Sequence, residues 1–226
     1  EYDLLGNITR VIDSLGNDTL FTYNQLNQVV RTLTQETGPG SGIRYAVDTY
    51  YDANDNVIRV ERENRDEEGV LRTNAFITRT MEYEILNAMT RETCEVDDGH
   101  VITTEYQYDK NRNRVLVRNP VAVNGSQPHN TVRKIFDERG LTYRTISAEE
   151  SPVQHTFQAD YDGNQNMIRT LDGVESDPAI ETTEYDGYDR RIKSTDALGN
   201  VKEWRYDANH NPLQYSVYGE MRDVPG

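Results

Sequence analysis

Apolar and polar residues alternate along this chain in short runs, and most runs end at an aromatic residue followed by a polar turn. In the segment 101–108, alternation places Ile102, Thr104, Tyr106 and Tyr108 on one face of an extended strand. β-Branched and aromatic residues of this kind favour strands. No segment repeats its apolar residues with the period of a helix. The pattern therefore predicts about 16 or 17 short strands and no sustained helix.

The aromatic residues that end the runs recur along the whole chain, and we call them anchors. The nine anchors are Tyr2, Tyr23, Tyr51, Tyr83, Tyr108, Phe136, Tyr161, Tyr185 and Tyr206. They are separated by 21, 28, 32, 25, 28, 25, 24 and 21 residues. Such spacings are typical of repeat proteins, in which each unit packs on its neighbours. We therefore predict one repeat array over residues 1–226, with no domain boundary.

An aspartate follows most anchors and predicts a tight turn. These turn residues are Asp3, Asp52, Asp109, Asp162, Asp186 and Asp207. An Asp side chain accepts hydrogen bonds from backbone N–H groups a few residues ahead. Four residues after the anchor, a residue type that tolerates a left-handed backbone stands at Gly6, Asn27, Asn87 and Gly140. Other copies carry Asn, Asp, Arg or His instead of glycine, and we expect their turns to be less regular.

Together these features predict an all-β fold, a single-layer antiparallel sheet of consecutive β-hairpins. The anchors would share one inward face, stack as an aromatic ladder and be the most buried residues. Longer spacings predict insertions at hairpin tips, in the segments 37–42, 64–69, 119–130 and 173–179. Unpaired edges at the two ends of the strip predict either a cover or edge-to-edge self-association.

Composition supports a thin sheet that is wetted on both faces. Only 35% of the residues are apolar and the net charge is −15, which disfavours nucleic acid and anionic membranes as partners. No apolar run approaches the ~18 residues that a membrane-spanning helix needs. The one cysteine, Cys94, excludes an internal disulfide framework.

At the level of these motifs, the whole chain resembles the RHS, or YD-repeat, family. The family pattern is an aromatic residue, Tyr-Asp, two variable residues, Gly-Asn or Gly-Arg, and a short strand. Matching copies are Glu1–Asn7 and the stretch from Asp196-Ala197-Leu198-Gly199-Asn200 to Tyr206-Asp207. The family occurs in bacterial polymorphic toxins, insecticidal toxin complexes, cell-wall-associated proteins and animal teneurins.

The resemblance implies a strip of hairpins that curves into part of a hollow shell enclosing a C-terminal toxin or effector. The partners would be the rest of a longer polypeptide and that enclosed segment, and the location would be secreted or cell-surface. Family members carry a self-cleaving aspartate near a Pro-x-x-Gly-Arg motif, which this sequence lacks. We therefore expect the cleavage core and the effector to lie outside this piece.

Candidate chemistry is sparse. Asp-x-Asn-x-Asn triplets, such as Asp52/Asn54/Asn56, match the start of a calcium loop but lack its glycine, so turns are the favoured interpretation. The carboxylates recur with the repeat, whereas an enzyme shows one singular constellation. We assign no catalytic residue, metal or cofactor and expect a non-catalytic scaffold. Tyrosines beside Asp and Asn leave a surface glycan-binding or adhesion module as the alternative.

Overall fold

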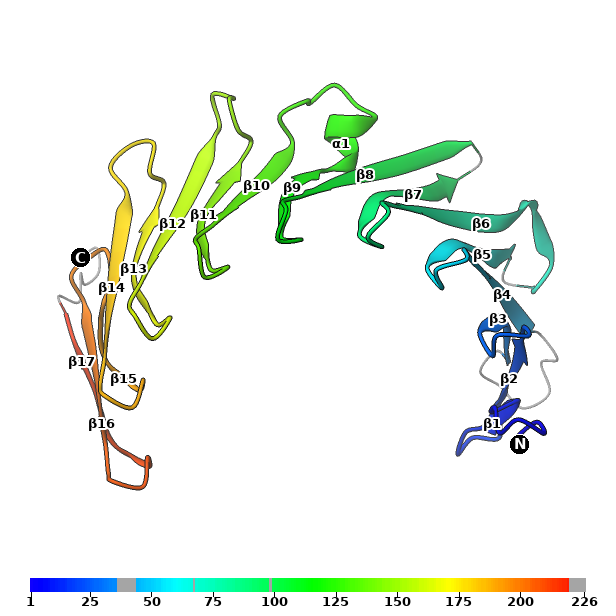
Figure 1. The fold of residues 1–226 in the computed structure, drawn as a ribbon, viewed down its shortest axis with the longest axis horizontal. Coiled ribbons are helices and arrows are strands. Elements are labelled where there is room, and N and C mark those ends of the chain that lie inside the picture. Colours follow the sequence, from blue (N-terminus) through cyan, green and yellow to red (C-terminus); the bar gives the residue numbers. More distant parts are fainter. Residues whose placement is uncertain (36–43, 67, 98, 220–226) are drawn as a thin grey trace, which may run out of the picture. The chain divides into compact units, whose positions relative to one another are not determined.

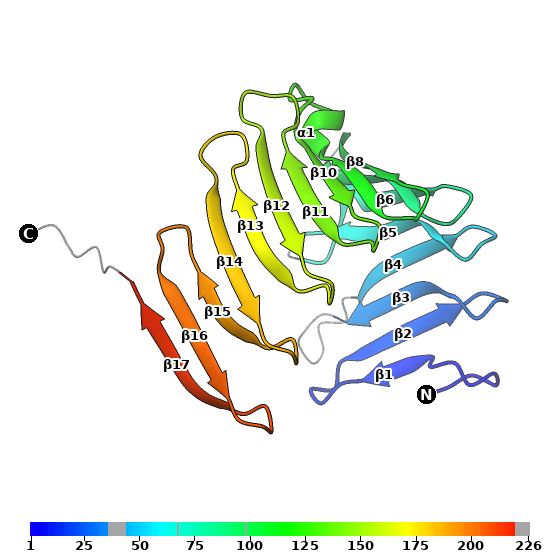
Figure 2. The same ribbon diagram turned by 60° about the vertical axis from the view of Figure 1, so that its left-hand side comes forward.

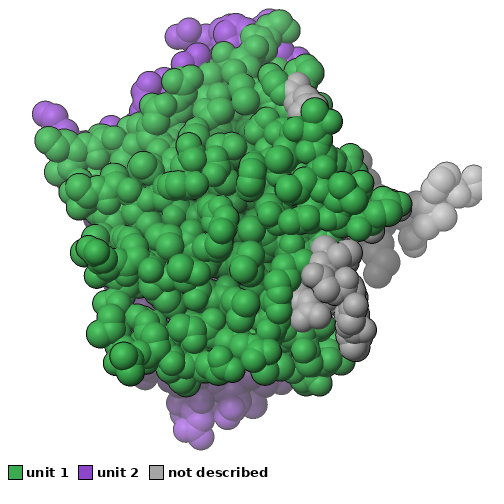
Figure 3. Space-filling model, turned by 90° about the vertical axis from the view of Figure 1, so that its right-hand side faces the viewer, with its two compact units in different colours: residues 1–106, 119–126 green, residues 107–118, 127–226 purple. Residues whose placement is uncertain are grey.

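The computed structural model describes residues 1–35, 44–66, 68–97 and 99–219. These residues form seventeen strands and one four-residue helix, which confirms the all-β prediction and the expected number of strands. The chain divides into two compact units (Figure 3). Unit 1 contains residues 1–106 and 119–126, and unit 2 contains residues 107–118 and 127–226. The single array over residues 1–226 stays a prediction.

Unit 1 is a meander in which every strand pairs antiparallel with the next one along the chain, from β1 to β8 (Figure 1). The last two residues of β8 belong to unit 2. The strands are β1 (Arg10–Ile12), β2 (Asp18–Tyr23), β3 (Val29–Gln35), β4 (Arg44–Tyr51), β5 (Val57–Arg65), β6 (Leu71–Tyr83), β7 (Met89–Asp97) and β8 (His100–Tyr108).

Unit 2 repeats the same arrangement from β9 to β17, and Figure 2 shows the hairpins from β10 onward side by side. Its strands are β9 (Arg114–Arg118), β10 (Thr131–Phe136), β11 (Thr142–Ser147), β12 (His155–Tyr161), β13 (Met167–Asp172), β14 (Ala179–Tyr185), β15 (Arg191–Thr195), β16 (Val201–Tyr206) and β17 (Pro212–Tyr218).

The predicted insertions fall between strands where the structure describes them. Residues 119–130 join β9 to β10 and contain the short helix α1 (Pro120–Val123), which begins at a proline, a residue favoured in the first turn of a helix. Residues 173–178 join β13 to β14, which begins at Ala179. Of the segment 64–69, residues 64 and 65 end β5, and residues 66, 68 and 69 lie between β5 and β6. The predicted insertion at 37–42 lies outside the described residues.

Burial corrects one expectation about the anchors. Most anchors are half-buried, and Tyr2 is 71% exposed. The most buried positions are small residues in or near strand centres, such as Ala159 at 1%, Thr103 at 2% and Ala46 at 3% exposure. In a single layer, neighbouring side chains alone cover each face. They can bury a small residue completely, but a large ring extends beyond them.

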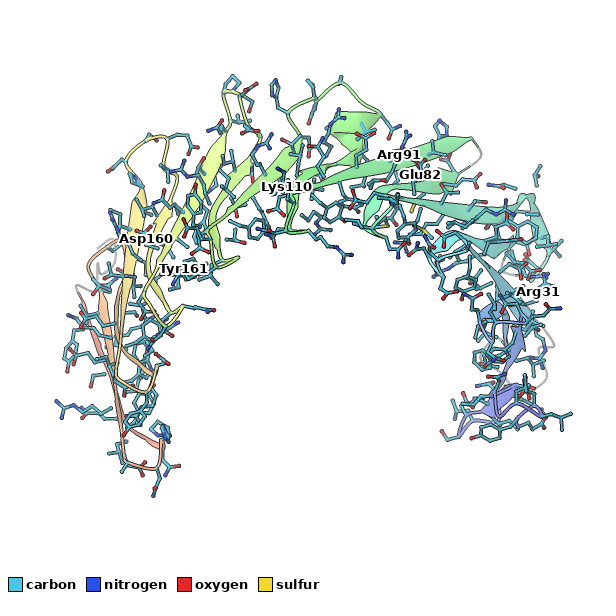
Figure 4. All side chains as sticks on the ribbon, in the orientation of Figure 1. Arg31, Glu82, Arg91, Lys110, Asp160 and Tyr161 are labelled. Atoms are coloured by element: carbon cyan, nitrogen blue, oxygen red, sulfur yellow. The ribbon has the colours of Figure 1, made fainter. Side chains whose placement is uncertain are left out.

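Charged pairs across neighbouring strands occupy much of the sheet surface. Arg31 on β3 pairs with Asp48 on β4, and Glu82 on β6 lies 3.9 Å from Arg91 on β7 (Figure 4). Exposed pairs of this kind contribute roughly 0–1 kcal/mol each. They keep the faces of the sheet compatible with water, as the composition predicts.

Asp18 is the one buried carboxylate among the described residues, at 5% exposure. Arg10 Nε lies 2.8 Å from one of its oxygens and Arg44 Nη2 lies 2.5 Å from the other. Burial would raise the pKa of this carboxyl, but the hydrogen bonds from Arg44 and Arg10 outweigh it and lower the pKa. The ionised carboxylate thus links β1, β2 and β4 across β3.

The last strand of unit 2, β17, exposes several large apolar side chains. β17 pairs with β16 and exposes the large apolar residues Leu213, Tyr215 and Val217. Self-association stays a prediction.

Candidate functional site

Each predicted turn residue closes its hairpin through one shared hydrogen-bond pattern. In the turn at 109–113, Asp109 N donates to Asn113 O and Arg112 N donates to Asp109 O, both at 3.0 Å. Asp109 Oδ1 accepts from the backbone N–H groups of Asn111 (2.9 Å) and Asn113 (2.8 Å). Its Oδ2 accepts from Asn113 Nδ2 at 3.0 Å. One carboxylate therefore satisfies three donors, and Lys110 occupies the next position of the turn (Figure 4).

The same pair of backbone hydrogen bonds occurs in twelve turns of the described residues. Nine follow the anchors and begin at Asp3, Asn24, Asp52, Glu84, Asp109, Asp137, Asp162, Asp186 and Asp207. Three close hairpins at the opposite ends of strands and begin at Asp13, Asp66 and Asp196. The pairing register of the two strands shifts at the anchor, because short hairpin loops of this kind contain a β-bulge. A short local sequence thus sets the geometry throughout both units.

The fourth position of each turn has a positive φ, as predicted for Gly6 (86°), Asn27 (61°), Asn87 (63°) and Gly140 (79°). The copies without glycine were expected to be less regular, and this expectation was wrong. Asp55, Arg112, Gln165, Asp189 and His210 have φ values of 66°, 67°, 72°, 59° and 67°. They keep both backbone hydrogen bonds of the turn.

Several of these non-glycine residues accept a hydrogen bond from the preceding anchor turn. Asn7 Nδ2 donates to Asn27 Oδ1 at 3.0 Å, and Gln28 Nε2 donates to Asp55 Oδ1 at 2.8 Å. The bond recurs from Asn56 to Asn87 at 2.9 Å and from Asn166 to Asp189 at 2.7 Å. A glycine at this position could not accept such a bond. The departures from glycine therefore connect neighbouring hairpins at their turn ends.

The anchors make a second connection between hairpins, which we call the tyrosine staple. In unit 1, Tyr51 Oη donates to Val29 O and Tyr83 Oη donates to Val57 O, both at 3.0 Å. Each accepting carbonyl belongs to the residue paired with the preceding anchor, as Val57 is with Tyr51. Among the described residues, staples run from at least six anchors, with distances of 2.8–3.2 Å: Tyr23, Tyr51, Tyr83, Tyr161, Tyr185 and Tyr206.

The staple explains why tyrosine predominates at the anchor position, a reason that the sequence alone did not reveal. Phe136 has no hydroxyl and cannot form it. Burial raises the pKa of Tyr83 and of Tyr161, so their hydroxyl groups stay protonated as donors (Tyr161 is labelled in Figure 4). The ring contacts of Tyr188 with His210 and of Trp204 with Tyr215 do not join two anchors. For the six stapled tyrosines, the hydroxyl-to-carbonyl bond therefore takes the place of the expected ring stacking.

A third connection lies at the opposite end of the strands, five residues before an anchor. The backbone N–H of Ala46 donates to Glu63 at 3.0 Å and that of Thr156 donates to Glu175 at 3.0 Å. The N–H groups of Thr78 and Thr103 are bound in the same way, by Glu95 and Asn124. The sequence analysis missed these caps. Their signal is a carboxylate or amide located 17–21 residues after the capped residue.

The calcium interpretation of the Asp-x-Asn-x-Asn triplets has no support in this geometry. Hydrogen bonds within the turn occupy both carboxylate oxygens of Asp52 and of Asp162. The side-chain hydrogen bonds from Asn56 and Asn166 are the largest cause of the lowered pKa of these two groups. Among the described residues, no group of three or more His, Cys, Asp or Glu could hold a metal ion.

Cys94 has a setting that does not favour reactivity. Burial is the main cause that raises the pKa of its thiol, and the carboxylate of Glu92 adds to the effect. A reactive cysteine needs the opposite shift. The absence of a catalytic residue nevertheless stays a prediction.

Replacing Asp109 with alanine is expected to lower the free energy of unfolding by about 1–2 kcal/mol, because three donors lose their acceptor. Asp109→Asn should cost less, since Asn24 performs the same role and accepts from Leu26 and Gln28. Lys110→Ala, at the exposed next position, provides the control. Urea denaturation would measure all three, and equal midpoints for Asp109→Ala and Lys110→Ala would contradict the assigned role.

Comparison with known proteins gives the following findings. No protein-family model matches the sequence, and no curated protein matches it. The crystal structure of TcdB2-TccC3-TEV is 12% identical, with a TM-score of 0.49 over 92% of this chain and 13% of that one. The Photorhabdus luminescens Tc holotoxin pore with a mutated TccC3 is 14% identical, with a TM-score of 0.49 over 98% of this chain and 12% of that one.

A porin-like protein from Bacteroides uniformis is 11% identical, with a TM-score of 0.29 over 92% of this chain and 95% of that one. Of the two toxin chains described above, by contrast, this chain spans only about an eighth of the length. With TM-scores below 0.5, these likenesses establish neither a family nor a function. Within the described residues, no helix has the length and apolar character needed to cross a membrane.

Proposed function

We propose that this chain is a non-catalytic structural segment that forms part of a hollow β-shell in a longer protein of the Rhs type. The observation that carries the proposal is the reuse of one construction. Within the part of the chain that the structure describes, the same turn occurs twelve times and the same hydroxyl-to-carbonyl staple at least six times. An enzyme concentrates its polar groups at one constellation, whereas these groups are distributed evenly, as in a repeat protein.

The connections between hairpins suit a wall. Backbone ladders join consecutive strands within each unit, turn side chains link hairpins at one end, and carboxylates cap backbone N–H groups at the other. Such a strip can be extended by further hairpins without changing its local chemistry. It would exclude outside molecules by continuous hydrogen bonding rather than by any particular residue.

The enclosed component would be a C-terminal toxin or effector segment of the same polypeptide, as the resemblance to the RHS family implies. The partners are then the rest of that polypeptide and the enclosed segment, without a cofactor. We place the protein outside the cell, secreted or at the bacterial surface. The wall would hold the effector inactive until it is released.

Protease protection in the full-length protein that contains this chain would test the proposal. We expect its C-terminal segment to resist an added protease. The double variant Tyr51→Ala/Tyr83→Ala removes two staples and should speed cleavage at least about tenfold, because cleavage follows the population of the open form. The variant Tyr51→Phe/Tyr83→Phe keeps the rings and should show a smaller increase.

Two results would contradict a wall. One is a C-terminal segment that is cut equally fast in the wild type and in the alanine variant. The other is a described residue whose replacement abolishes the activity of the parent protein without changing its stability, since that points to a functional site.

A further inference from the structure

An open groove of about 670 Å³ lies on unit 1, where the hairpin of β2 and β3 meets the hairpin of β4 and β5. Its lining includes Leu26, Arg31, Asp48, Tyr50 and Ile58. The volume lies within the ~300–1,000 Å³ that is usual for small-molecule sites. The wall function proposed above does not require this groove.

A fixed polar pair lies in the groove. Arg31 on β3 and Asp48 on β4 are directly opposite in the register. Arg31 Nε lies 2.6 Å from Asp48 Oδ1, and Nη2 lies 2.7 Å from Oδ2. This fork uses two of the five donors of the guanidinium, so Arg31 keeps hydrogen-bonding capacity. The side chain of Arg31 is 49% exposed, and Figure 4 labels it on its strand.

An aromatic ring with a fixed orientation stands beside this pair. Tyr50 Oη donates to Glu61 Oε2 at 2.9 Å, and Arg59 Cζ lies 4.2 Å from the ring centroid. Both partners come from β5, whereas most of the groove lining comes from β2, β3 and β4. Tyr50 remains 39% exposed, and the exposed Leu26 (70%) and Ile58 (37%) add apolar surface.

The groove contains one ion pair and one further carboxylate. The charges of Arg31 and Asp48 cancel, whereas Asp52 keeps its negative charge, with both oxygens accepting hydrogen bonds from its own turn. An anionic ligand would meet no unpaired cation in this lining, a cation would meet only a carboxylate that is already hydrogen-bonded, and a wholly apolar ligand would bury the ion pair at a cost. The lining fits a neutral ligand that has both an apolar face and many hydrogen-bonding groups.

We infer that this groove binds a neutral saccharide. The C–H-rich face of a pyranose ring would lie against Tyr50, and its hydroxyl groups would hydrogen-bond to Arg31 and Asp48. Aromatic side chains with a fixed orientation provide such contact area at a low entropic cost. Glycan binding, the alternative function, thereby gains a location centred on Tyr50, Arg31 and Asp48, none of which is an anchor or a turn residue.

Saturation-transfer difference NMR of the chain with chitohexaose and with maltohexaose, each at millimolar concentration, would test the site. We expect transfer to ring C–H protons of at least one of the two sugars. Tyr50→Ala should weaken binding at least tenfold, and Tyr50→Phe should keep it within threefold because the ring remains. Arg31→Lys, which keeps the charge but cannot form the fork, should also weaken binding.

The matched control is Tyr188→Ala, which removes a more exposed tyrosine in unit 2 and should leave binding unchanged. Thermal unfolding shows whether each variant is folded. If Tyr50→Ala does not fold, Arg31→Lys still tests the site. The inference is overturned if neither sugar receives saturation, or if both Tyr50→Ala and Arg31→Lys bind as the wild type does. A neutral glycine-serine peptide that binds more tightly than both sugars would overturn it as well. None of these results bears on protease protection by the wall.

Discussion

Replacement of Tyr83 by alanine is expected to lower the free energy of unfolding by about 2–3 kcal/mol, below the ~3–5 kcal/mol of a fully buried aromatic residue because this ring is only half-buried. The variant loses the ring between two hairpins and leaves Val57 O without its hydroxyl donor. Urea denaturation followed by circular dichroism would measure the change. Tyr83→Phe should cost about 1 kcal/mol, the usual net contribution of one hydrogen bond.

Ile85→Ala is the surface control for this pair, because Ile85 is 92% exposed in the turn that follows Tyr83 and should change stability little. Equal stability of Tyr83→Phe and the wild type would show that the hydroxyl-to-carbonyl bond contributes nothing. The anchor would then act through its ring alone, as the sequence analysis expected.

Acidification from about pH 6 to about pH 2 is expected to destabilise both units. The turn carboxyls have folded pKa values below the ordinary 3.8, at Asp3, Asp13, Asp52, Asp109, Asp137, Asp162, Asp186, Asp196 and Asp207. A lowered folded pKa means that the stabilisation is complete above the unfolded value. It is lost as the pH falls below 3.8 toward the folded values, because protonation converts one acceptor oxygen of each turn into a hydroxyl and removes the charge that strengthens the hydrogen bonds.

Glu175 extends this loss over a wider range of pH. The hydrogen bond from Thr156 is the main cause that lowers its pKa from 4.5 to about 2. Its contribution is therefore complete above pH 4.5 and disappears as the pH falls to about 2. Glu175→Gln should remove this part of the dependence while the loss from the turn aspartates remains.

The measurement is the urea midpoint between about pH 6 and pH 2 in about 0.5 M salt, which screens the repulsion arising from the net negative charge at pH 6 and from the net positive charge at pH 2. Lys110→Ala, which removes no carboxylate, serves as the control and should follow the wild-type curve. A wild-type midpoint that stays constant down to pH 2.5 would mean that the turn carboxylates do not stabilise the fold.

Local sequence determined the strands and the turns. Alternation of residues set the strand faces, and each Asp with a left-handed residue three positions later set a turn, because both depend on groups within a few residues. This is why the turn at 109–113 and the positive φ of Asn27 could be predicted. The hydrogen-bonding order of consecutive strands followed from the short loops.

Only the tertiary structure decided what joins one hairpin to the next. Tyr83 Oη reaches Val57 O across 26 residues, and Gln28 reaches Asp55 across 27. Such bonds depend on how neighbouring hairpins align, which no local pattern specifies. The same holds for the groove beside Tyr50, which forms where two hairpins meet. Burial also escaped the sequence, because in a single layer it depends on which neighbours extend over a residue and not on how apolar that residue is.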